Sequence, residues 1–554
     1  MLNIKLRDPN TIMKLSRLGS FHQSKLSFLR SFLSEFKDWE YNKDLFALNK
    51  KGVGVAVYSF KKKERVYSLV CFANEIKDKE RSDRVIATKW DAAFTLYDGI
   101  PSRLDIKRLK NEVPKQEVGR LSYKELTLSR ANKSIRIFNH VVDSLSKGNQ
   151  PNLDLIDEVG YLYRTTAVYG SGKFGLADRF RIKNREEING PFRLEMMLVY
   201  LVRQFTFDQV NHVAKSINPK KAVELDPKIC KNLGIGNSTG LGMAPFIVNH
   251  PTLLNNWILS REKALKKIRE LKKVKIHESE MFKNCLRESI RNITSWNTES
   301  EYQKNKIKNL LKDVRKFLNF VEKKFNFDVD YPFNKIYIWL ENKTCEECIE
   351  YVVSIMMEPF NHITKPLINE MSSEEEKYFN IPAHRSVKEL KNIIKKRYPN
   401  ILKINFQKKE NYKKFWFISK NKEEPRLADN RFEEIGSELE QPLAIARDIK
   451  KLYEKLNLSK DNLTIDKFLI KYSELRHVIR RAFIIEKFPY SEIQDNTISE
   501  KTIPIDMLRL KLSFFGALKF DPRSDKWLRI CMFQGAPLPY ELKNFDEQWV
   551  YKKN

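Results

Sequence analysis

Cysteine is scarce in this chain. Only 6 cysteines occur among 554 residues, too few for a disulfide framework and typical of a reducing compartment. The N-terminus has neither the continuous apolar stretch nor the cleavage-site pattern of a signal peptide. The longest apolar run, residues 196–202, is far shorter than the ~20 residues that cross a bilayer. We therefore expect a soluble, cytoplasmic protein with no membrane partner.

Metal and redox motifs are also weak. Cys345 and Cys348 form the only CxxC pair, and the two Glu residues between them oppose thiolate formation. No second Cys/His pair has the spacing of a zinc site. The one ExxH pattern, Glu474 with His477, has no second copy, which a di-metal bundle would need. The sequence predicts no metal site and identifies no cofactor.

Acidic residues are outnumbered, with 102 Lys and Arg against 71 Asp and Glu and a net charge of +31. Clustered cations bind nucleic acid by releasing its counterions. Two Lys-rich stretches, 262–325 and 388–422, are candidates, and the second has interleaved aromatic residues on which bases could stack. The competing explanations are a Lys-rich composition imposed by an AT-rich genome and, for 388–422, a half-buried strand with a wet Lys side. Nucleic-acid binding is therefore an alternative function.

The length favours several domains, and the 42% hydrophobic content is ample for buried cores. No repeat of solenoid length occurs. We predict an α+β fold in which helices predominate, with a small antiparallel β element near the N-terminus and a second α+β lobe at the C-terminus. The predicted units are an α+β domain over 1–110, a helical domain with the candidate site over 111–275, a Lys-rich helical connector over 276–330 and an α+β domain over 331–554.

Hydrophobic periodicity predicts the individual elements. Strands are expected over 45–49, 53–60, 65–72, 335–340, 404–406 and 414–419. Helices are expected over 24–37, 87–97, 122–147, 154–169, 191–216, 251–271, 387–397, 440–457 and 464–486. The connector is expected to be a helical hairpin or one long helix.

A glycine-rich segment, 234–242, is the strongest candidate site. Four glycines in nine residues permit positive φ angles and close approach to a ligand. We expect a loop that binds an anion through backbone N–H groups and polar side chains, and the alternative is a tight packing loop. Its spacing is not that of a dinucleotide fingerprint, and a GxSxG elbow would need an adjoining strand and helix. The predicted ligand-contacting residues are Gly236, Asn237, Ser238, Thr239 and Gly240.

A second glycine-rich segment, 169–175, contains Lys173. A Walker A motif would need glycine at Ala167 and Ser or Thr at Phe174, so a P-loop is disfavoured. Lys173 could still meet a phosphate or carboxylate as a point charge. The alternative is a helix C-cap turn with a solvated lysine.

The predicted helix 122–147 adds further candidates. Arg130 lies within its apolar face, where a guanidinium needs a carboxylate partner or an anionic ligand. His140 and Asp143 share the opposite face three residues apart, so the carboxylate could orient the imidazole as a general base; an ordinary solvated face is the alternative. Arg164 supplies a second guanidinium in the same region.

These observations predict an intracellular enzyme that acts on a small anionic metabolite, a carboxylate or a phosphate, with its reaction type and oligomeric state open. Lys173, Arg130 and Arg164 would hold the negative group. His250, Tyr169 or His140, the last with Asp143, would transfer protons. His250 precedes Pro251 at a helix start, where the dipole favours the neutral imidazole. A non-catalytic scaffold is a further alternative, favoured if these groups prove to be scattered in space.

Overall fold

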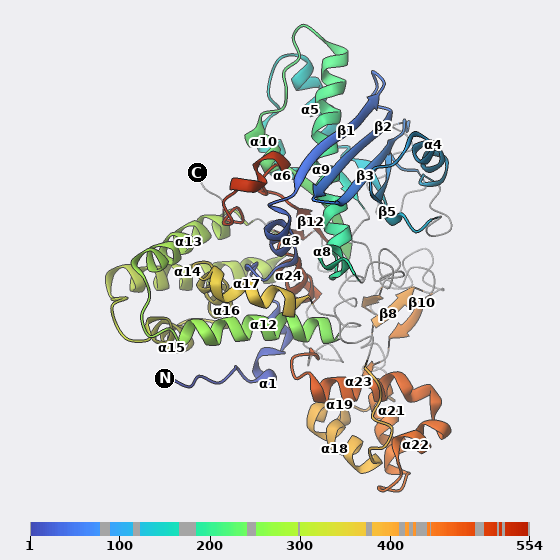
Figure 1. Cartoon of the computed structure of the whole chain (residues 1–554). Coiled ribbons are helices and arrows are strands. Elements are labelled where there is room, and N and C mark those ends of the chain that lie inside the picture. Colours follow the sequence, from blue (N-terminus) through green and yellow to red (C-terminus); the bar gives the residue numbers. More distant parts are fainter. Residues whose placement is uncertain are drawn as a thin grey trace.

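The computed structural model describes residues 2–20, 22–77, 89–114, 122–165, 184–240, 251–296, 298, 300–372, 379–408, 416–419, 425–427, 440–443, 445–493, 504–517, 520–522 and 527–551. Their fold is mixed α+β, and helices predominate (Figure 1). None of the helices in these ranges combines the length and the apolar character that a membrane crossing requires.

One sheet of nine strands organises the N-terminal half of the chain, in the order β1-β2-β3-β4-β5-β6-β7-β12-β11. Neighbouring strands are antiparallel except β6 and β7, which are parallel. The predicted meander is confirmed in β1 to β3 but belongs to this much larger sheet. The strands are β1 (Glu40–Leu48), β2 (Gly54–Lys62), β3 (Arg65–Ala73), β4 (Ala92–Asp98), β5 (Glu125–Lys133), β6 (Tyr161–Thr165), β7 (Gly234–Gly240), β11 (Phe520–Pro522) and β12 (Trp527–Met532).

Three helices pack on the sheet: α4 (Arg103–Glu112), α5 (Phe138–Ser146) and α9 (Arg193–Ile217). α9 crosses one face and contacts β3 to β7, and α5 packs beside it. Tyr163 of β6 donates a hydrogen bond to Gln209 of α9 at 2.8 Å. On the opposite face Leu109 of α4 joins a smaller apolar cluster with Val57 of β2. The sheet is therefore covered mainly by α9.

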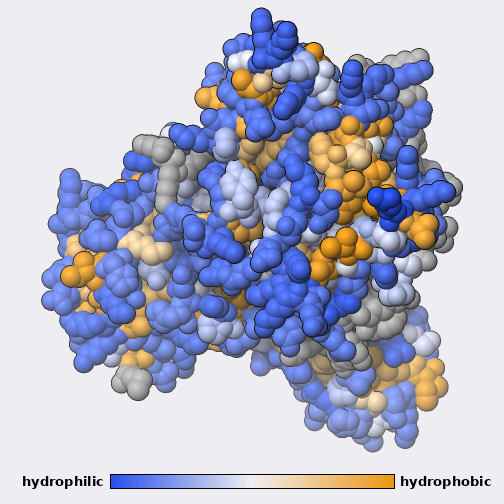
Figure 2. All heavy atoms as spheres, turned by 45° about the horizontal axis from the view of Figure 1, so that its top comes forward, coloured by the Kyte–Doolittle hydropathy of each residue, from blue (hydrophilic) through white to orange (hydrophobic). Residues whose placement is uncertain are grey.

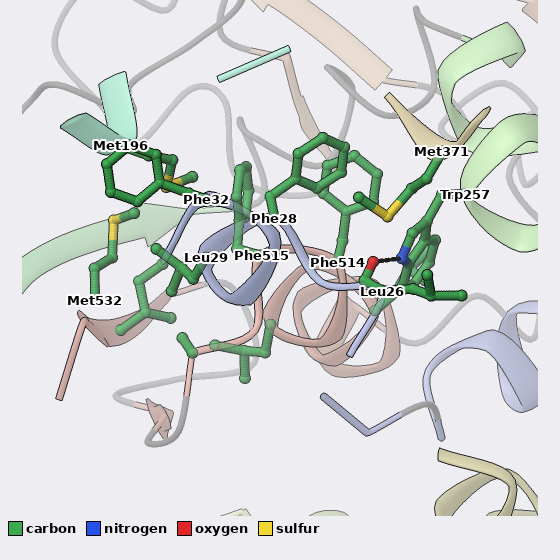
Figure 3. Packing of buried hydrophobic residues seen from close by; sticks show 14 of the residues in the cluster. Leu26, Phe28, Leu29, Phe32, Met196, Trp257, Met371, Phe514, Phe515 and Met532 are labelled. Carbon is green, nitrogen blue, oxygen red and sulfur yellow. Dashed lines mark hydrogen bonds between the residues drawn. The ribbon is translucent and has the colours of Figure 1, made fainter. Parts of the chain in front are cut away.

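A second group of helices lies beside the sheet: α12 (Pro251–Arg269), α13 (Ile276–Thr294), α14 (Glu301–Lys323), α15 (Pro332–Lys343), α16 (Glu346–Met356) and α17 (Asn361–Met371). α13 and α14 pack on each other as the predicted helical hairpin. The core is continuous with that of the sheet through α3 (Phe28–Phe36) and α24 (Pro504–Phe515). Figure 3 shows Phe28 against Phe514, with Trp257 on one side and Met196 on the other.

Residues 385–408 and 445–493 form what we call the C-terminal helical group, which extends from the rest of the molecule in Figure 1. Its α-helices are α18 (Val387–Arg397), α19 (Pro399–Leu402), α21 (Ile445–Asn457), α22 (Ile465–Lys471) and α23 (Arg476–Lys487). Short strands between its two parts, β8 (Trp416–Ser419), β9 (Pro425–Leu427) and β10 (Glu440–Leu443), pair in a separate sheet. Asn255 of α12 accepts a hydrogen bond from the Tyr490 N–H at 3.0 Å, which ties this group to the body.

Several predicted elements are wrong. The helix predicted over 122–147 is strand β5 followed by α5, and the helix predicted over 154–169 is α6 (Leu153–Val159) followed by β6. The helix predicted over 87–97 corresponds to β4, whereas the strand predicted over 335–340 lies in α15. The segment 404–406 is not in a strand. Short apolar runs fit both the helical period and the two-residue period of a strand, so their neighbours in space decide between helix and strand.

The sheet joins segments that were predicted to belong to different domains. β4 pairs with β5 across residue 110, and β12, near the C-terminus, pairs with β7. The two ends of the chain therefore contribute to one sheet. Hydrophilic residues cover most of the face in Figure 2, with hydrophobic residues in separate patches.

Candidate functional site

β6 and β7 are parallel neighbours inside the sheet, and the ends of such strands commonly hold ligands. Arg164 pairs with Gly236, and Tyr161 pairs with Gly234. α9 lies between the two strands in sequence and packs on both of them. The carboxyl ends of β6 and β7 therefore lie side by side, which is where open α/β sheets bind ligands. We use the name carboxyl edge for Arg164 and Thr165 of β6 together with residues 237–240 of β7.

The predicted loop over 234–242 is wrong in its described part, because Gly234–Gly240 is a central strand. Neither Gly234 nor Gly236 has a positive φ. A Cβ on Gly236 would lie 2.7 Å from the Tyr161 ring, and one on Gly234 would lie 2.2 Å from the Met532 carbonyl oxygen. These two glycines are therefore required by close packing within the sheet.

Arg130 and Arg164 lie on one face at this edge. Asn132 of β5 pairs with Arg164 of β6, and Arg130 is two residues from Asn132, so it points to the same side of the sheet. Arg164 is 8% exposed. Arg130 is half-buried, and its guanidinium lies 5.9 Å from the centre of the Trp90 ring. The structure thus brings together two guanidinium-bearing residues that the sequence singled out.

Polar side chains also occupy the opposite face. Ser129 and Thr165 share a hydrogen bond at 2.7 Å between their hydroxyl oxygens. Asn237 is fully buried, and among the described residues neither its amide nitrogen nor its amide oxygen has a hydrogen-bond partner. An unsatisfied buried amide costs about 1–3 kcal/mol, and a bound water, ion or ligand is a usual reason for one. Asn237 is therefore a buried amide at this edge that can accept a further partner.

Hydrogen bonds of Arg203 hold α9 beside the amino end of β7. Arg203 donates from Nε to the carbonyl oxygen of Leu233, just before β7 begins, at 2.7 Å. Arg193, the first residue of α9, is ten positions earlier, which is about 15 Å along the helix axis. Arg193 pairs with Glu35, so the amino end of α9 contacts α3.

His140 and Asp143 lie elsewhere. β5 leaves the sheet toward the amino end of β6, since Lys133 pairs with Tyr163, and α5 follows there. His140 Nε2 accepts a hydrogen bond from the N–H of Asn152 at 3.2 Å, and Asp143 is exposed. The structure does not bring this pair to the carboxyl edge.

The remaining predicted residues lie outside the described ranges. Tyr169 and Lys173 belong to 166–183, and His250 belongs to 241–250. The backbone of Ser238, Thr239 and Gly240 is described as part of β7. In the sequence, 166–183 follows Thr165, the last residue of β6, and 241–250 follows Gly240, the last residue of β7.

Sequence reasoning missed Asp91, which is fully buried beside this face. Its carboxylate accepts a hydrogen bond from the Lys133 N–H at 3.0 Å, and its own N–H donates to Asn132 at 2.9 Å. Because 87–97 was predicted as a helix, the sequence did not place Asp91 beside β5. Its position there follows from the pairing of the next strand, β4, with β5. An acidic residue directly before an apolar run was the available signal.

No family model, curated protein or solved structure matches this chain. The chemistry of the carboxyl edge must therefore be argued from its own groups. Guanidinium groups recognise carboxylate and phosphate through paired charge-assisted hydrogen bonds. The Asn237 amide can either donate or accept.

Proposed function

We propose that the protein is a cytoplasmic enzyme that binds a small anionic metabolite, a carboxylate or a phosphate, at the carboxyl edge of β6 and β7. The observation that carries this proposal is the placement of Arg130 and Arg164 on one face of adjacent strands, beside the single parallel pair of the described sheet. Low exposure of Arg164 strengthens its attraction for an anion, because water screens the charge less there.

Further groups would complete the site. The Asn237 amide would donate to the ligand or to a water that bridges to it. Lys173 would add a positive charge, and Tyr169 or His250 would transfer protons, since their segments follow in sequence the adjacent ends of β6 and β7. The reaction itself is open, because these groups serve many proton-transfer reactions equally well.

The test compares thermal unfolding with and without inorganic phosphate, malonate and citrate. A ligand at a hundred times its Kd stabilises the folded state by about 2.7 kcal/mol. We expect at least one anion to raise the melting temperature of the wild type and of the Arg136→Gln control. Arg136 pairs with Glu158 at 3.2 Å, away from the carboxyl edge.

The variants Arg164→Gln and Arg130→Gln should lose this ligand-induced shift. Arg164→Lys keeps the charge without the bidentate geometry, so it should retain part of the shift and serves if the Gln variant does not fold. Equal shifts in the wild type and in both Gln variants would reject the site. If Arg136→Gln loses as much of the melting-temperature shift as Arg164→Gln and Arg130→Gln do, the overall charge of the protein, rather than the carboxyl edge, binds the anion.

Nucleic-acid binding is the second candidate, and the charge of the C-terminal helical group favours it. Its described residues, 385–408 and 445–493, contain 19 Lys and Arg against 8 Asp and Glu. The logarithm of the affinity for a short single-stranded RNA should then fall linearly with the logarithm of salt concentration, with a slope set by the number of phosphates contacted. Binding that does not change with salt would contradict this candidate.

A further inference from the structure

A cleft separates the N-terminal segment from the C-terminal helical group. Its volume is about 340 Å³, within the range of small-molecule sites. One wall comes from residues 9–14, and the other comes from 396–401 with Ile485, Pro489 and Glu492. Small-molecule sites often lie where two structural units of a protein meet.

The cleft carries unbalanced positive charge. Lys14, Lys396 and Arg397 line it, and these three side chains have no ion-pair or hydrogen-bond partner within the described ranges. Glu492 is the one carboxylate among the described lining residues. It is already bound by Arg481, whose Nε and Nη2 donate to it at 2.7 and 2.6 Å.

The rest of the lining suits a compact organic molecule. Met13, Ile401 and Ile485 are buried apolar residues at the cleft, and Pro9, Pro399 and Pro489 add rigid walls. A purely inorganic ion would leave this apolar surface uncovered, whereas a carbon skeleton would bury it. The lining therefore fits a ligand with an apolar part between its charged groups.

Both walls are held in place without a ligand. The Tyr398 hydroxyl donates to Glu492 at 3.1 Å, which ties α18 to the segment after α23. The Tyr490 hydroxyl donates to the Arg7 carbonyl oxygen at 2.5 Å, which ties that segment to the N-terminal residues. A preformed cleft loses less entropy when a ligand binds.

We propose that this cleft binds a small organic polyanion that carries at least two phosphate or carboxylate groups. Lys396 and Arg397 contact the ligand from the C-terminal helical group, and Lys14 contacts it from the N-terminal segment. The bound ligand bridges these two parts of the protein. This site is separate from the carboxyl edge of β6 and β7, so each site can be tested without the other.

The experiment is isothermal titration calorimetry of the full chain with fructose 1,6-bisphosphate and with citrate as probes. The wild type should bind one of them at micromolar to millimolar concentration. The double variant Lys396→Gln/Arg397→Gln and the single variant Lys14→Gln should each bind it about tenfold more weakly or worse, since charge-assisted hydrogen bonds are lost. Lys395→Gln is the matched control, because Lys395 is exposed on the same helix but does not line the cleft.

Circular dichroism verifies that the variants fold, which is expected because Lys14 and Lys396 are exposed. Binding that is unchanged in Lys395→Gln and in Arg164→Gln supports the proposal. The proposal is overturned if neither probe binds the wild type, if the cleft variants bind as well as the wild type, or if Lys395→Gln loses as much affinity as they do. The last result would point to diffuse charge of the kind that binds nucleic acid.

Discussion

Arg164 of β6 and Gly236 of β7 are direct partners in the parallel pairing of the sheet. The glycine is needed there because the Tyr161 ring occupies the space that a side chain on residue 236 would fill. Tyr161 is itself only 2% exposed, so its ring has no solvent to move into. The packing of Tyr161 on Gly236 thus holds β7 close to β6 and sets the position of Arg164 at the carboxyl edge.

Gly236→Ala should therefore destabilise the protein. The new Cβ would lie 2.7 Å from ring carbons of Tyr161, and overpacking of this kind costs about 1–3 kcal/mol. Urea denaturation measures the loss. Tyr161→Leu combined with Gly236→Ala should recover part of it, because the smaller side chain leaves room for the methyl group. Purely additive losses in the double variant would contradict the contact.

The long elements could be predicted from the sequence. The three strands of the β1–β3 meander, the helix α9 and the α13–α14 hairpin all follow from hydrophobic periods sustained over many residues. α18 matches its predicted bounds of 387–397. In each of these segments the local pattern and the tertiary environment favour the same structure, so local reasoning suffices.

The candidate site was harder to predict because its strands are short and their partners are distant in sequence. β5 has apolar residues at spacings that also fit a helix, and it is a strand because β4 and β6 flank it. Glycine normally weakens a strand, so Gly234–Gly240 looked like a loop. Met532 and Tyr161 are the reasons for Gly234 and Gly236, and no local pattern reveals those contacts.

A buried ion-pair network around Glu350 should control acid stability. Glu350 is fully buried and accepts from Arg7 Nη1 at 2.8 Å and from Arg17 Nε at 2.5 Å. Burial by itself would raise the pKa of Glu350, but Arg7 and Arg17 outweigh it, and the pKa is lowered. Glu350→Gln would leave two guanidiniums short of a partner, at a cost of about 3–5 kcal/mol.

The pH dependence has a definite sign. A carboxyl whose folded pKa is lowered stabilises the fold above its unfolded pKa, and this contribution is lost as the pH falls through the folded pKa. Urea denaturation of Glu350→Gln should thus show a deficit at neutral pH that shrinks under acid. The control is Glu370→Gln, since Glu370 is exposed and its partner Lys263 is only half-buried, and it should change little. A deficit that does not depend on pH would contradict the charge interaction.

His22 should make the protein less stable in weak acid. Burial, together with the nearby charges of Arg509, Arg261 and Arg30, lowers its pKa from 6.5 to about 3. The imidazole packs against Tyr351 and Trp296, with ring centres 4.3 and 5.6 Å away. Below pH 6.5 His22 is therefore protonated in the unfolded state, whereas in the folded state it is protonated only at about pH 3 and below.

Stability should consequently be unaffected by His22 above pH 6.5 and should fall by up to about 1.4 kcal/mol per pH unit below it. Urea denaturation at a series of pH values should show a shallower slope for His22→Gln, because glutamine does not titrate. The control is His277→Gln on α13, where the exposed imidazole should leave the slope as in the wild type. Equal slopes in His22→Gln and the wild type would show that His22 is protonated in the folded protein.

Cys345 should be an unreactive thiol despite its place at the start of α16. Burial raises its pKa to about 11, and Asp313 contributes through its charge and hydrogen bonding. Asp313 also accepts a hydrogen bond from the Cys345 N–H at 2.8 Å. The usual lowering of a thiol pKa at a helix amino end is thus outweighed, because a carboxylate occupies the position where a cation would be needed.

Iodoacetamide labelling followed by mass spectrometry checks this expectation. Since only the thiolate reacts, Cys345 should be alkylated roughly a hundredfold more slowly than a free cysteine at mildly alkaline pH. Asp313→Asn should speed the labelling, because the group that opposes thiolate formation is then neutral. Cys348, whose burial also raises its pKa, should stay unlabelled in both proteins and serves as the internal control. Rapid labelling of Cys345 in the wild type, or a disulfide between Cys345 and Cys348, would instead make this pair a redox site.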